Sequence, residues 1–153
     1  MNWISRNENP LDVFSSWYED ANKVTPFEPT KMTLATVDDQ GMPSARVVLL
    51  KGYGQSGFSF YTNYESKKSK ELISTEKGAL CFHWEKPHHR QIRIRGMVEK
   101  VSAQESDEYF QTRVRGSQIG AWASPQSQSI NSREELALRI EEFEKKFGDD
   151  PIP

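Results

Sequence analysis

The sequence lacks the features that mark secreted and membrane proteins. Its 153 residues contain a single cysteine, Cys81, which excludes an intramolecular disulfide framework. No apolar run approaches the roughly 20 residues of a membrane-spanning helix. The N-terminal segment MNWISRNENP has no apolar core of the kind found in signal peptides. We therefore expect a cytoplasmic protein without a membrane segment.

Nucleic-acid and metal-binding patterns are also scarce. The 20 Lys and Arg residues are balanced by 22 Asp and Glu residues, and the formal net charge is -2 at pH 7. This balance does not predict a broad basic surface for nucleic acid, and any anion site should be local. Cys81 and His83 would share a strand face, but the adjacent pair His88 and His89 lacks chelating spacing. The sequence therefore predicts no nucleic-acid partner and no metal site.

The chain has enough apolar material for one folded unit. It is 35% hydrophobic and 11% aromatic, which at this length supports one core but not two. We expect a single domain over residues 1–153. Apolar runs bounded by Gly, Pro and Asp turns predict strands at 32–37, 47–50, 58–61, 78–84 and 91–95. Helical periodicity predicts helices at 10–23, 66–74, 102–113, 115–123 and 132–147.

Capping residues mark the starts of three of these helices. Asn9 precedes Pro10, which suits the first helical position. Ser102 and Ser132 each stand three residues before a glutamate, which is the capping-box pattern. Together with the strands, these helices predict a mainly β protein with peripheral helices (α+β), built on a small antiparallel sheet or barrel.

Residues 44–68 hold a dense group of candidate site residues. The apolar run at 47–50 is flanked by Arg46 and Lys51, while Lys67 and Lys68 follow the next strand. Cations at the ends of apolar strands suit a ligand with a flat apolar part and an anionic tail, because the backbone can line the ring. An ordinary surface hairpin with charged ends is the alternative. Arg46 and Lys51 are five residues apart, so a regular strand would point them to opposite faces unless it twists or bulges.

A second candidate site is formed by Tyr109, Arg113 and Ser117. Their spacing would place a phenol, a guanidinium and a hydroxyl along one helix face if the helix continues. All three groups donate hydrogen bonds to anions, so the pattern indicates a phosphate site. A solvated helix face is the alternative explanation, and Gly116 could end the helix before Ser117.

A third pattern alternates along the predicted strand at 91–95. Gln91, Arg93 and Arg95 would share one face, while Ile92 and Ile94 would occupy the other. A half-buried strand with one solvated side explains this alternation fully. The pattern alone therefore predicts no ligand for Gln91.

Several segments together resemble a known family. They are RVVLLKGYG, FYTNYESKK, RQIRIRG, YFQTRVRGSQIGAWAS and PQSQSI, and their order and spacing resemble those of the pyridoxamine 5'-phosphate oxidase family. The similarity extends from about Asn9 to Pro153. It implies an antiparallel split β-barrel of the FMN-binding type that forms a homodimer with FMN at the subunit interface. It also implies FMN-dependent oxidation of pyridoxamine or pyridoxine 5'-phosphate to pyridoxal 5'-phosphate, with oxygen as acceptor.

The resemblance also implies which residues bind the two ligands. The residues implied for FMN are Arg46, Val47, Val48, Leu49, Leu50, Lys51, Tyr61, Thr62, Lys67, Lys68, Gln91, Gln126 and Ser127. The residues implied for the substrate phosphate are Lys51, Tyr109, Arg113 and Ser117. No catalytic side chain is implied, because the flavin carries out the chemistry.

Individual roles within the FMN set follow from the same resemblance. Arg46 would meet the phosphate and Gln91 would approach the ring. Gln126 and Ser127 would reach a cofactor bound mainly by the other subunit. Lys67 stands where the family commonly has arginine, which keeps the charge but loses the bidentate fork.

The chain departs from the family pattern at its C-terminal end. Family members continue past the position of Pro153 with strands that supply a tryptophan and an arginine to FMN and an Arg-x-His motif to the substrate. The chain is therefore expected to be short relative to the family. Two other functions stay open: a non-catalytic protein that binds FMN or pyridoxal phosphate, and a flavin-barrel reductase with another substrate.

Overall fold

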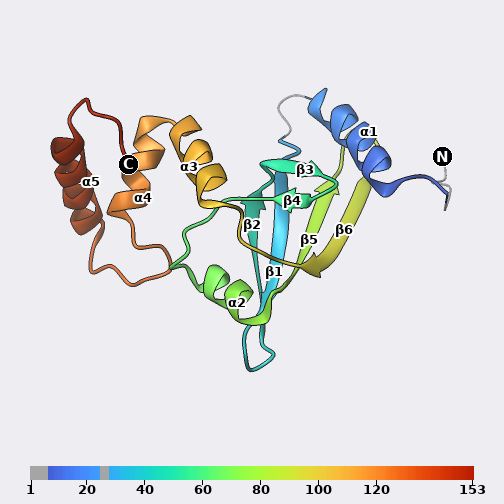
Figure 1. Ribbon diagram of the computed structural model, residues 1–153, viewed down its shortest axis with the longest axis horizontal. Coiled ribbons are helices and arrows are strands. Elements are labelled where there is room, and N and C mark those ends of the chain that lie inside the picture. The colour runs from blue at the N-terminus through green and yellow to red at the C-terminus, as the bar shows by residue number, and fades with distance from the viewer. Residues whose placement is uncertain (1–6, 25–27) are drawn as a thin grey trace.

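The computed structural model describes residues 7–24 and 28–153 (Figure 1). Its strands are β1 (Lys31–Val37), β2 (Pro43–Leu49), β3 (Gly52–Gly54), β4 (Gly57–Ser59), β5 (Lys77–Trp84) and β6 (Arg90–Met97). Its helices are α1 (Pro10–Asn22), α2 (Lys67–Thr75), α3 (Ala103–Thr112), α4 (Arg115–Ala123) and α5 (Arg133–Phe147). Residues 1–6 of the N-terminal segment considered above lie outside the described ranges.

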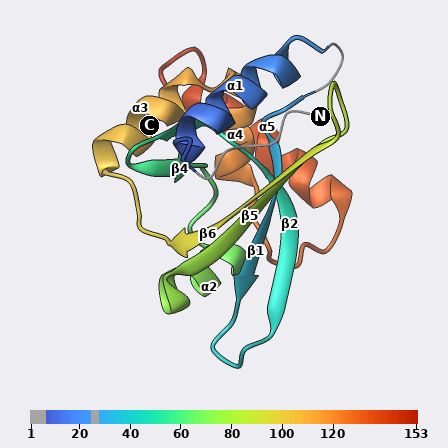
Figure 2. The same cartoon turned by 90° about the vertical axis from the view of Figure 1, so that its right-hand side faces the viewer.

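The strands form two antiparallel sheets. The main sheet has the order β2-β1-β5-β6, and β3 pairs with β4 in a separate hairpin. Helices lie around the sheets in both views (Figures 1 and 2), so the predicted α+β arrangement of an antiparallel sheet with peripheral helices is confirmed. Strand β3 was not predicted. It pairs Tyr53 with Phe58 across a turn that ends at Gly57, whose φ of 118° favours glycine.

The helix boundaries follow the predicted capping residues. Asn9 accepts a hydrogen bond from the backbone N–H of Leu11 at 3.0 Å, and Pro10 occupies the first turn of α1. Ser102 and Ser132 cap α3 and α5 in the same way, each by accepting from the N–H three residues later. These hydrogen bonds satisfy donors that a helix start leaves unpaired, which is why the sequence locates the three starts well.

The core lies between the main sheet, the β3–β4 hairpin and α1. Leu34 of β1 and Phe82 and Trp84 of β5 are at most 1% exposed. The ring of Phe14 in α1 meets the ring of Phe82 edge-on, with centroids 5.3 Å apart, and that of Tyr53 at 4.8 Å. Edge-on aromatic pairs add to the stabilisation from buried area, so this cluster holds α1 against both sheets.

Helices α3, α4 and α5 form a group to one side of the main sheet (Figure 1). Trp122 of α4 packs against Phe143 and Phe147 of α5, with centroids 5.9 and 5.5 Å apart. The chain end lies along the same group, because Ile152 is 1% exposed and the indole N–H of Trp122 donates to the carbonyl of Pro153 at 3.1 Å. The predicted apolar stripe of α5 therefore packs as expected.

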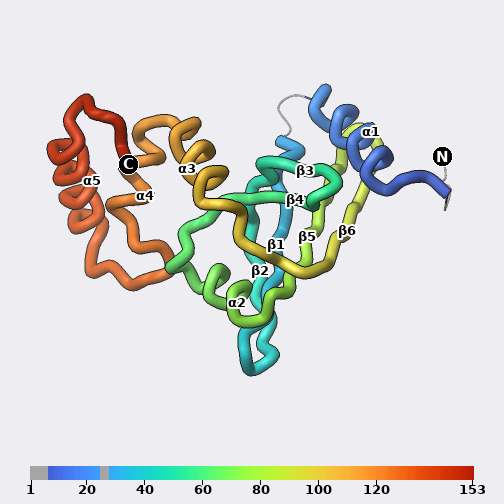
Figure 3. Tube along the Cα trace, in the orientation of Figure 1, coloured from blue at the N-terminus to red at the C-terminus, as the bar shows by residue number. Residues whose placement is uncertain are grey.

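Two connections bring the sheets and the helical group together. The trace in Figure 3 shows the β6–α3 link entering the helical group and the β4–α2 link running toward the α4–α5 loop before it returns. A hydrogen bond from Thr62 Oγ1 to Gln126 Oε1, at 3.3 Å, joins that link to the α4–α5 loop. Within residues 7–24 and 28–153, no helix combines the length and apolar character needed to cross a bilayer.

Candidate functional site

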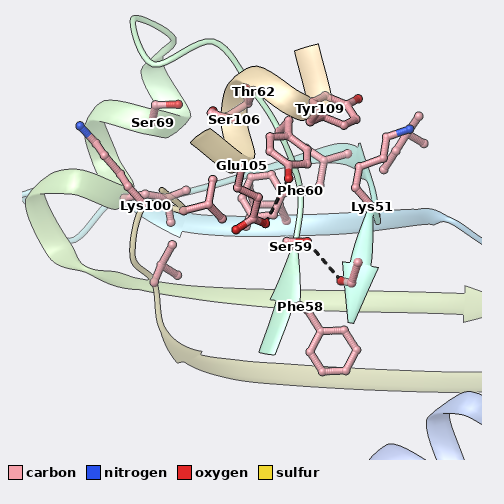
Figure 4. A pocket seen from close by; sticks show the side chains of 18 of the residues that line it. Lys51, Phe58, Ser59, Phe60, Thr62, Ser69, Lys100, Glu105, Ser106 and Tyr109 are labelled. Carbon is pink, nitrogen blue, oxygen red and sulfur yellow. Dashed lines mark hydrogen bonds between the residues drawn. The ribbon is translucent and has the colours of Figure 1, made fainter. Parts of the chain in front are cut away.

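An open cleft of about 2520 Å³ lies between the β2–β4 region and helices α3 and α4. Figure 4 shows part of its lining, with Lys51, Thr62, Glu105 and Tyr109 on neighbouring elements. Most of the predicted site residues line this cleft, namely Val47, Val48, Leu49, Lys51, Tyr61, Thr62, Lys68, Tyr109, Arg113, Ser117 and Gln126. The predicted residues outside its lining are Arg46, Leu50, Lys67, Gln91 and Ser127.

A single helix does not run from Tyr109 to Ser117, so the condition for a shared helix face is not met, and the separate helices predicted at 102–113 and 115–123 are confirmed. Helix α3 ends at Thr112, and Arg113 is its C-cap with an extended ψ of 145°. Val114 is also extended, and Ser117 lies one turn into α4. The three side chains therefore share no helix face. They are brought to the same cleft by the bend between α3 and α4, and all three are half-buried there.

Two tyrosines stack inside the cleft beside a lysine. The rings of Tyr61 and Tyr109 are nearly parallel, with centroids 3.7 Å apart and planes 5° apart. Lys51 Nζ lies 5.7 Å from the Tyr109 ring centroid. The Tyr61 hydroxyl donates to Glu105 Oε1 at 3.2 Å, and partial burial together with this contact raises the pKa of Tyr61. This end of the cleft thus combines an aromatic stack with a cation.

The end of β2 separates the directions of Arg46 and Lys51. Strand β2 stops at Leu49, so neither the twist nor the bulge considered from the sequence is needed. The side chain of Leu50 is 3% exposed in the core, and its N–H donates to the carbonyl of Thr30 at 2.8 Å. The N–H of Lys51 donates to the carbonyl of Ser59 at 2.9 Å, and the Lys51 side chain is exposed at the cleft.

Lys68 lies at the centre of a polar group at the start of α2. Its ammonium donates to Thr62 Oγ1 at 3.0 Å, to Ser66 Oγ at 3.1 Å and to Gln126 Oε1 at 2.6 Å. Burial and the nearby charge of Arg46 lower the pKa of Lys68. Lys68, Thr62 and Gln126 are thus brought together within one chain, although they are far apart in the sequence.

Arg46 points inward from β2 and is held by its own chain. Its Nη1 donates to Thr36 Oγ1 at 2.5 Å and to the carbonyls of Leu34 and Ser44 at 3.3 Å. Its Nη2 donates to Glu71 Oε2 at 3.3 Å. Glu71 was not predicted as a site residue. Its only signal in the sequence is a place next to Leu72 in a short helix, which does not distinguish it from a solvated charge.

Lys67 and Ser127 lie together outside the cleft. They line a second hollow of about 470 Å³, and Lys67 Nζ is 3.7 Å from Glu71 Oε1. Lys67 is two thirds exposed, so this ion pair alone contributes little to stability. Lys67 and Lys68 are adjacent but line different hollows, because successive helix residues point in different directions.

Gln91 lies on the solvated side of β6. It is exposed together with Arg93 and Arg95, while Ile92 and Ile94 pack against the core. The predicted alternation is therefore confirmed. Cross-strand pairing places Gln91 opposite His83 of β5, and Gln91 does not line the cleft, whereas Arg95 farther along β6 does.

The fold and the cleft define a class: an α+β protein with an antiparallel sheet and an open cleft lined by cations, hydroxyls and stacked aromatic rings. The family model described as pyridoxamine 5'-phosphate oxidase matches residues 21–147. Proteins from Brucella canis and Brucella abortus strain S19, both named pyridoxine/pyridoxamine 5'-phosphate oxidase, are 50% identical to this chain over 152 residues. The matches cover 98% of this chain and 74% of each relative. The chain belongs to the pyridoxamine 5'-phosphate oxidase family.

Solved structures agree with this assignment. PhzG from Burkholderia lata 383, in complex with tetrahydrophenazine-1-carboxylic acid, matches with a TM-score of 0.88 and 26% identity over 97% of this chain and 73% of PhzG. A pyridoxamine 5'-phosphate oxidase-related, FMN-binding protein from Nostoc punctiforme matches with a TM-score of 0.63 over 87% of this chain and 72% of its own. At 14% identity, the second match supports the fold alone.

Proposed function

We propose that this chain is a flavoprotein oxidoreductase of vitamin B6 metabolism. It would oxidise pyridoxamine 5'-phosphate or pyridoxine 5'-phosphate to pyridoxal 5'-phosphate, with FMN as cofactor and oxygen as acceptor. The observation that carries the proposal is the convergence of Lys51, Tyr109, Arg113 and Ser117 on one cleft despite the break between α3 and α4. A guanidinium, an ammonium and two hydroxyls suit a phosphate ester.

The residues around Arg46 and Lys68 fit the phosphate of FMN. Arg46 has five N–H donors, of which its protein contacts use only part, and Lys68 brings a second cation to its side. Val47, Val48 and Leu49 line the cleft from this end, so an apolar ring beside them would have its phosphate near the cations. When bound, FMN would accept the hydride from C4' of the substrate and pass the electrons to oxygen.

The protein's own contribution would be mainly positional. Lys51 and Arg113 would bind the substrate phosphate, and the Tyr61–Tyr109 stack provides a flat apolar surface beside them. Holding both reactants in one orientation can supply a large part of a catalytic effect without an acid or base side chain. We therefore propose no catalytic residue.

We further infer a homodimer in which the two sheets of each subunit form a split β-barrel and FMN lies at the subunit interface. Gln91 supports this inference, because it lies outside the lining of the cleft of its own chain. If Gln91 approaches a flavin ring, that ring would belong to a site shared with a second copy. Ser127 also lies outside the cleft, whereas Gln126 contacts Lys68 of its own chain.

One experiment tests the proposed function. Purified protein should be yellow, and its flavin absorbance should bleach anaerobically when pyridoxamine 5'-phosphate is added. Yellow protein that never bleaches would indicate a non-catalytic FMN-binding protein. Bleaching by an aromatic carboxylic acid such as the PhzG ligand, but not by the phosphate ester, would instead indicate an enzyme of this fold with another substrate.

A further inference from the structure

The buried carboxylate of Glu71 closes a ring of hydrogen bonds around the Arg46 guanidinium. Arg46 Nη1 donates to Thr36 Oγ1, and Thr36 Oγ1 donates to Glu71 Oε2 at 2.5 Å. Arg46 Nη2 donates to the same Glu71 oxygen at 3.3 Å. Thr36 is 1% exposed and Glu71 is 5% exposed, so their side of the ring is buried, whereas the Arg46 side chain is 21% exposed.

The other carboxylate oxygen of Glu71 also has polar neighbours. Ser44 Oγ donates to Oε1 at 3.4 Å, and Lys67 Nζ lies 3.7 Å from it. The hydrogen bond from Thr36, opposed in part by burial and aided by the charges of Arg46 and Lys67, lowers the pKa of Glu71. Glu71 is therefore an anion held between β1, β2 and α2, and it also lines the second hollow together with Lys67.

This carboxylate offsets repulsion among the cations of the proposed phosphate site. Two cations, Arg46 and Lys67, contact Glu71, and Lys68 follows Lys67 in the chain. Burial and the charge of Arg46 lower the pKa of Lys68. In the absence of a counter-ion, a guanidinium in this position would gain by turning toward water. The contacts with Thr36 and Glu71 keep the guanidinium turned inward.

We propose that Glu71 is the positioning residue of the cofactor phosphate site. It fixes the Arg46 guanidinium in the orientation that receives the phosphate of FMN, and it acts on the phosphate through Arg46 rather than by contact. The inference rests on the proposed function, because it takes FMN as the ligand of Arg46. The inference adds Glu71 to the site as a residue that contacts Arg46 and does not contact the ligand itself.

The test compares FMN with riboflavin, which lacks the phosphate, as ligands of the full chain after removal of any bound flavin. Flavin fluorescence titration gives a Kd for each, and the ratio of the riboflavin Kd to the FMN Kd measures the phosphate contribution. Glu71→Ala should lower this ratio by about 10- to 100-fold, because the charged hydrogen bond that orients Arg46 is lost. Glu71→Gln keeps an acceptor and should lower it by less.

Riboflavin binding also separates positioning from folding. The riboflavin Kd should stay within about twofold of the wild-type value in each variant that folds. If Glu71→Ala does not fold, Glu71→Gln is the test, and its ratio of riboflavin Kd to FMN Kd should be lower than that of the wild type by about threefold or more. Glu65→Gln is the matched control, since Glu65 is an exposed acid that pairs with Lys70 at 3.5 Å, and its ratio should not change.

Three results would overturn the proposal for different reasons. An unchanged ratio in Glu71 variants of a phosphate-selective wild type would make Glu71 purely structural, and a raised ratio would mean that it mainly repels the phosphate. A wild-type protein that binds riboflavin as tightly as FMN would refute the phosphate site itself, and with it the cofactor assignment of the proposed function.

Discussion

Tyr61 and Tyr109 lie ring against ring, with centroids 3.7 Å apart, although one follows β4 and the other belongs to α3. The resemblance places Tyr61 with the flavin residues and Tyr109 with the substrate residues. The stack is therefore a direct physical contact between the two proposed halves of the site. Glu105 reinforces it by accepting from the Tyr61 hydroxyl one turn before Tyr109 on α3.

Replacing Tyr109 should separate the roles of its ring and its hydroxyl. Tyr109→Phe keeps the stack and removes one donor, so the Kd for pyridoxamine 5'-phosphate should rise by about 3- to 10-fold with little loss of stability. Tyr109→Ala also removes the stack and should cost about 0.5–1.5 kcal/mol more in the free energy of unfolding. Substrate titration and chemical denaturation measure the two effects. Equal substrate Kd values for wild type and Tyr109→Phe would show that the hydroxyl does not bind the phosphate.

Arg113→Ala should weaken the substrate selectively. Arg113 lines the cleft at the junction of α3 and α4, whereas Arg46 lies on β2 and Lys68 at the start of α2. Loss of a guanidinium contact should raise the Kd for pyridoxamine 5'-phosphate by about 10- to 100-fold and leave the FMN Kd within about twofold. Parallel titrations with both ligands test this. A comparable loss of both ligands would rule out a dedicated substrate-phosphate role.

Arg46→Ala should release FMN and also destabilise the fold. The substitution leaves Glu71, which is 5% exposed, without its guanidinium partner, and an unsatisfied buried charged group costs about 1–3 kcal/mol or more. Arg46→Lys keeps a positive charge but not the fork, so FMN occupancy should be intermediate. Flavin content after gel filtration gives the occupancy. Full flavin content in purified Arg46→Ala would refute the role assigned to Arg46.

Glu71 should make stability depend on acid pH. Its pKa in the folded protein lies below the ordinary value of 4.5, so its contribution to stability is complete above that value and is lost as the pH falls through the folded pKa. The difference in the free energy of unfolding between wild type and Glu71→Gln should therefore be constant near neutral pH and shrink below about pH 4.5. Urea titrations at several pH values measure it. A difference that does not vary with pH would indicate that packing, not charge, is lost.

Lys68 should make FMN binding depend on alkaline pH. Burial and the charge of Arg46 lower its pKa from the ordinary 10.5, so it loses its proton more readily than an exposed lysine. A bound phosphate would favour the charged form, so the FMN affinity should fall as the pH rises toward 10.5, while riboflavin affinity should not. Lys68→Arg stays charged and should remove most of this dependence. Identical pH profiles for the two proteins would exclude Lys68 from the phosphate site.

Much of the fold follows from local sequence patterns. Ser102 and Ser132 locate helix starts because their hydroxyls satisfy backbone donors nearby, and the alternation through Ile92 and Ile94 locates β6 because one face is buried. Strand β3 is harder to predict, since its three residues, Gly52–Gly54, form a strand only by pairing with β4. Local signals therefore predict long elements better than short pairings.

The geometry of the site is harder to predict from the sequence than the fold, because it depends on how distant segments pack together. The sequence predicts separate helices at 102–113 and 115–123, but nothing in the side chains of Arg113 and Val114 indicates that an extended bend between them brings Tyr109, Arg113 and Ser117 to one cleft. The burial of Glu71 likewise depends on α2 packing beside β1 and β2. The sequence predicts the candidate cations, whereas the contact between Glu71 and Arg46 is visible only in three dimensions.

The bend at Arg113 and Val114 separates the part of the cleft formed by α3 from the part formed by α4. Tyr109 stacks on Tyr61 on one side of the bend, and Ser117 belongs to α4, which packs on α5 through Trp122 and Phe143. In the proposed site, the span between Tyr109 and Ser117 therefore depends on how α4 packs on α5. Selectivity for ligand length can accordingly evolve through apolar substitutions at the α4–α5 contact, without any change in the residues that touch the ligand.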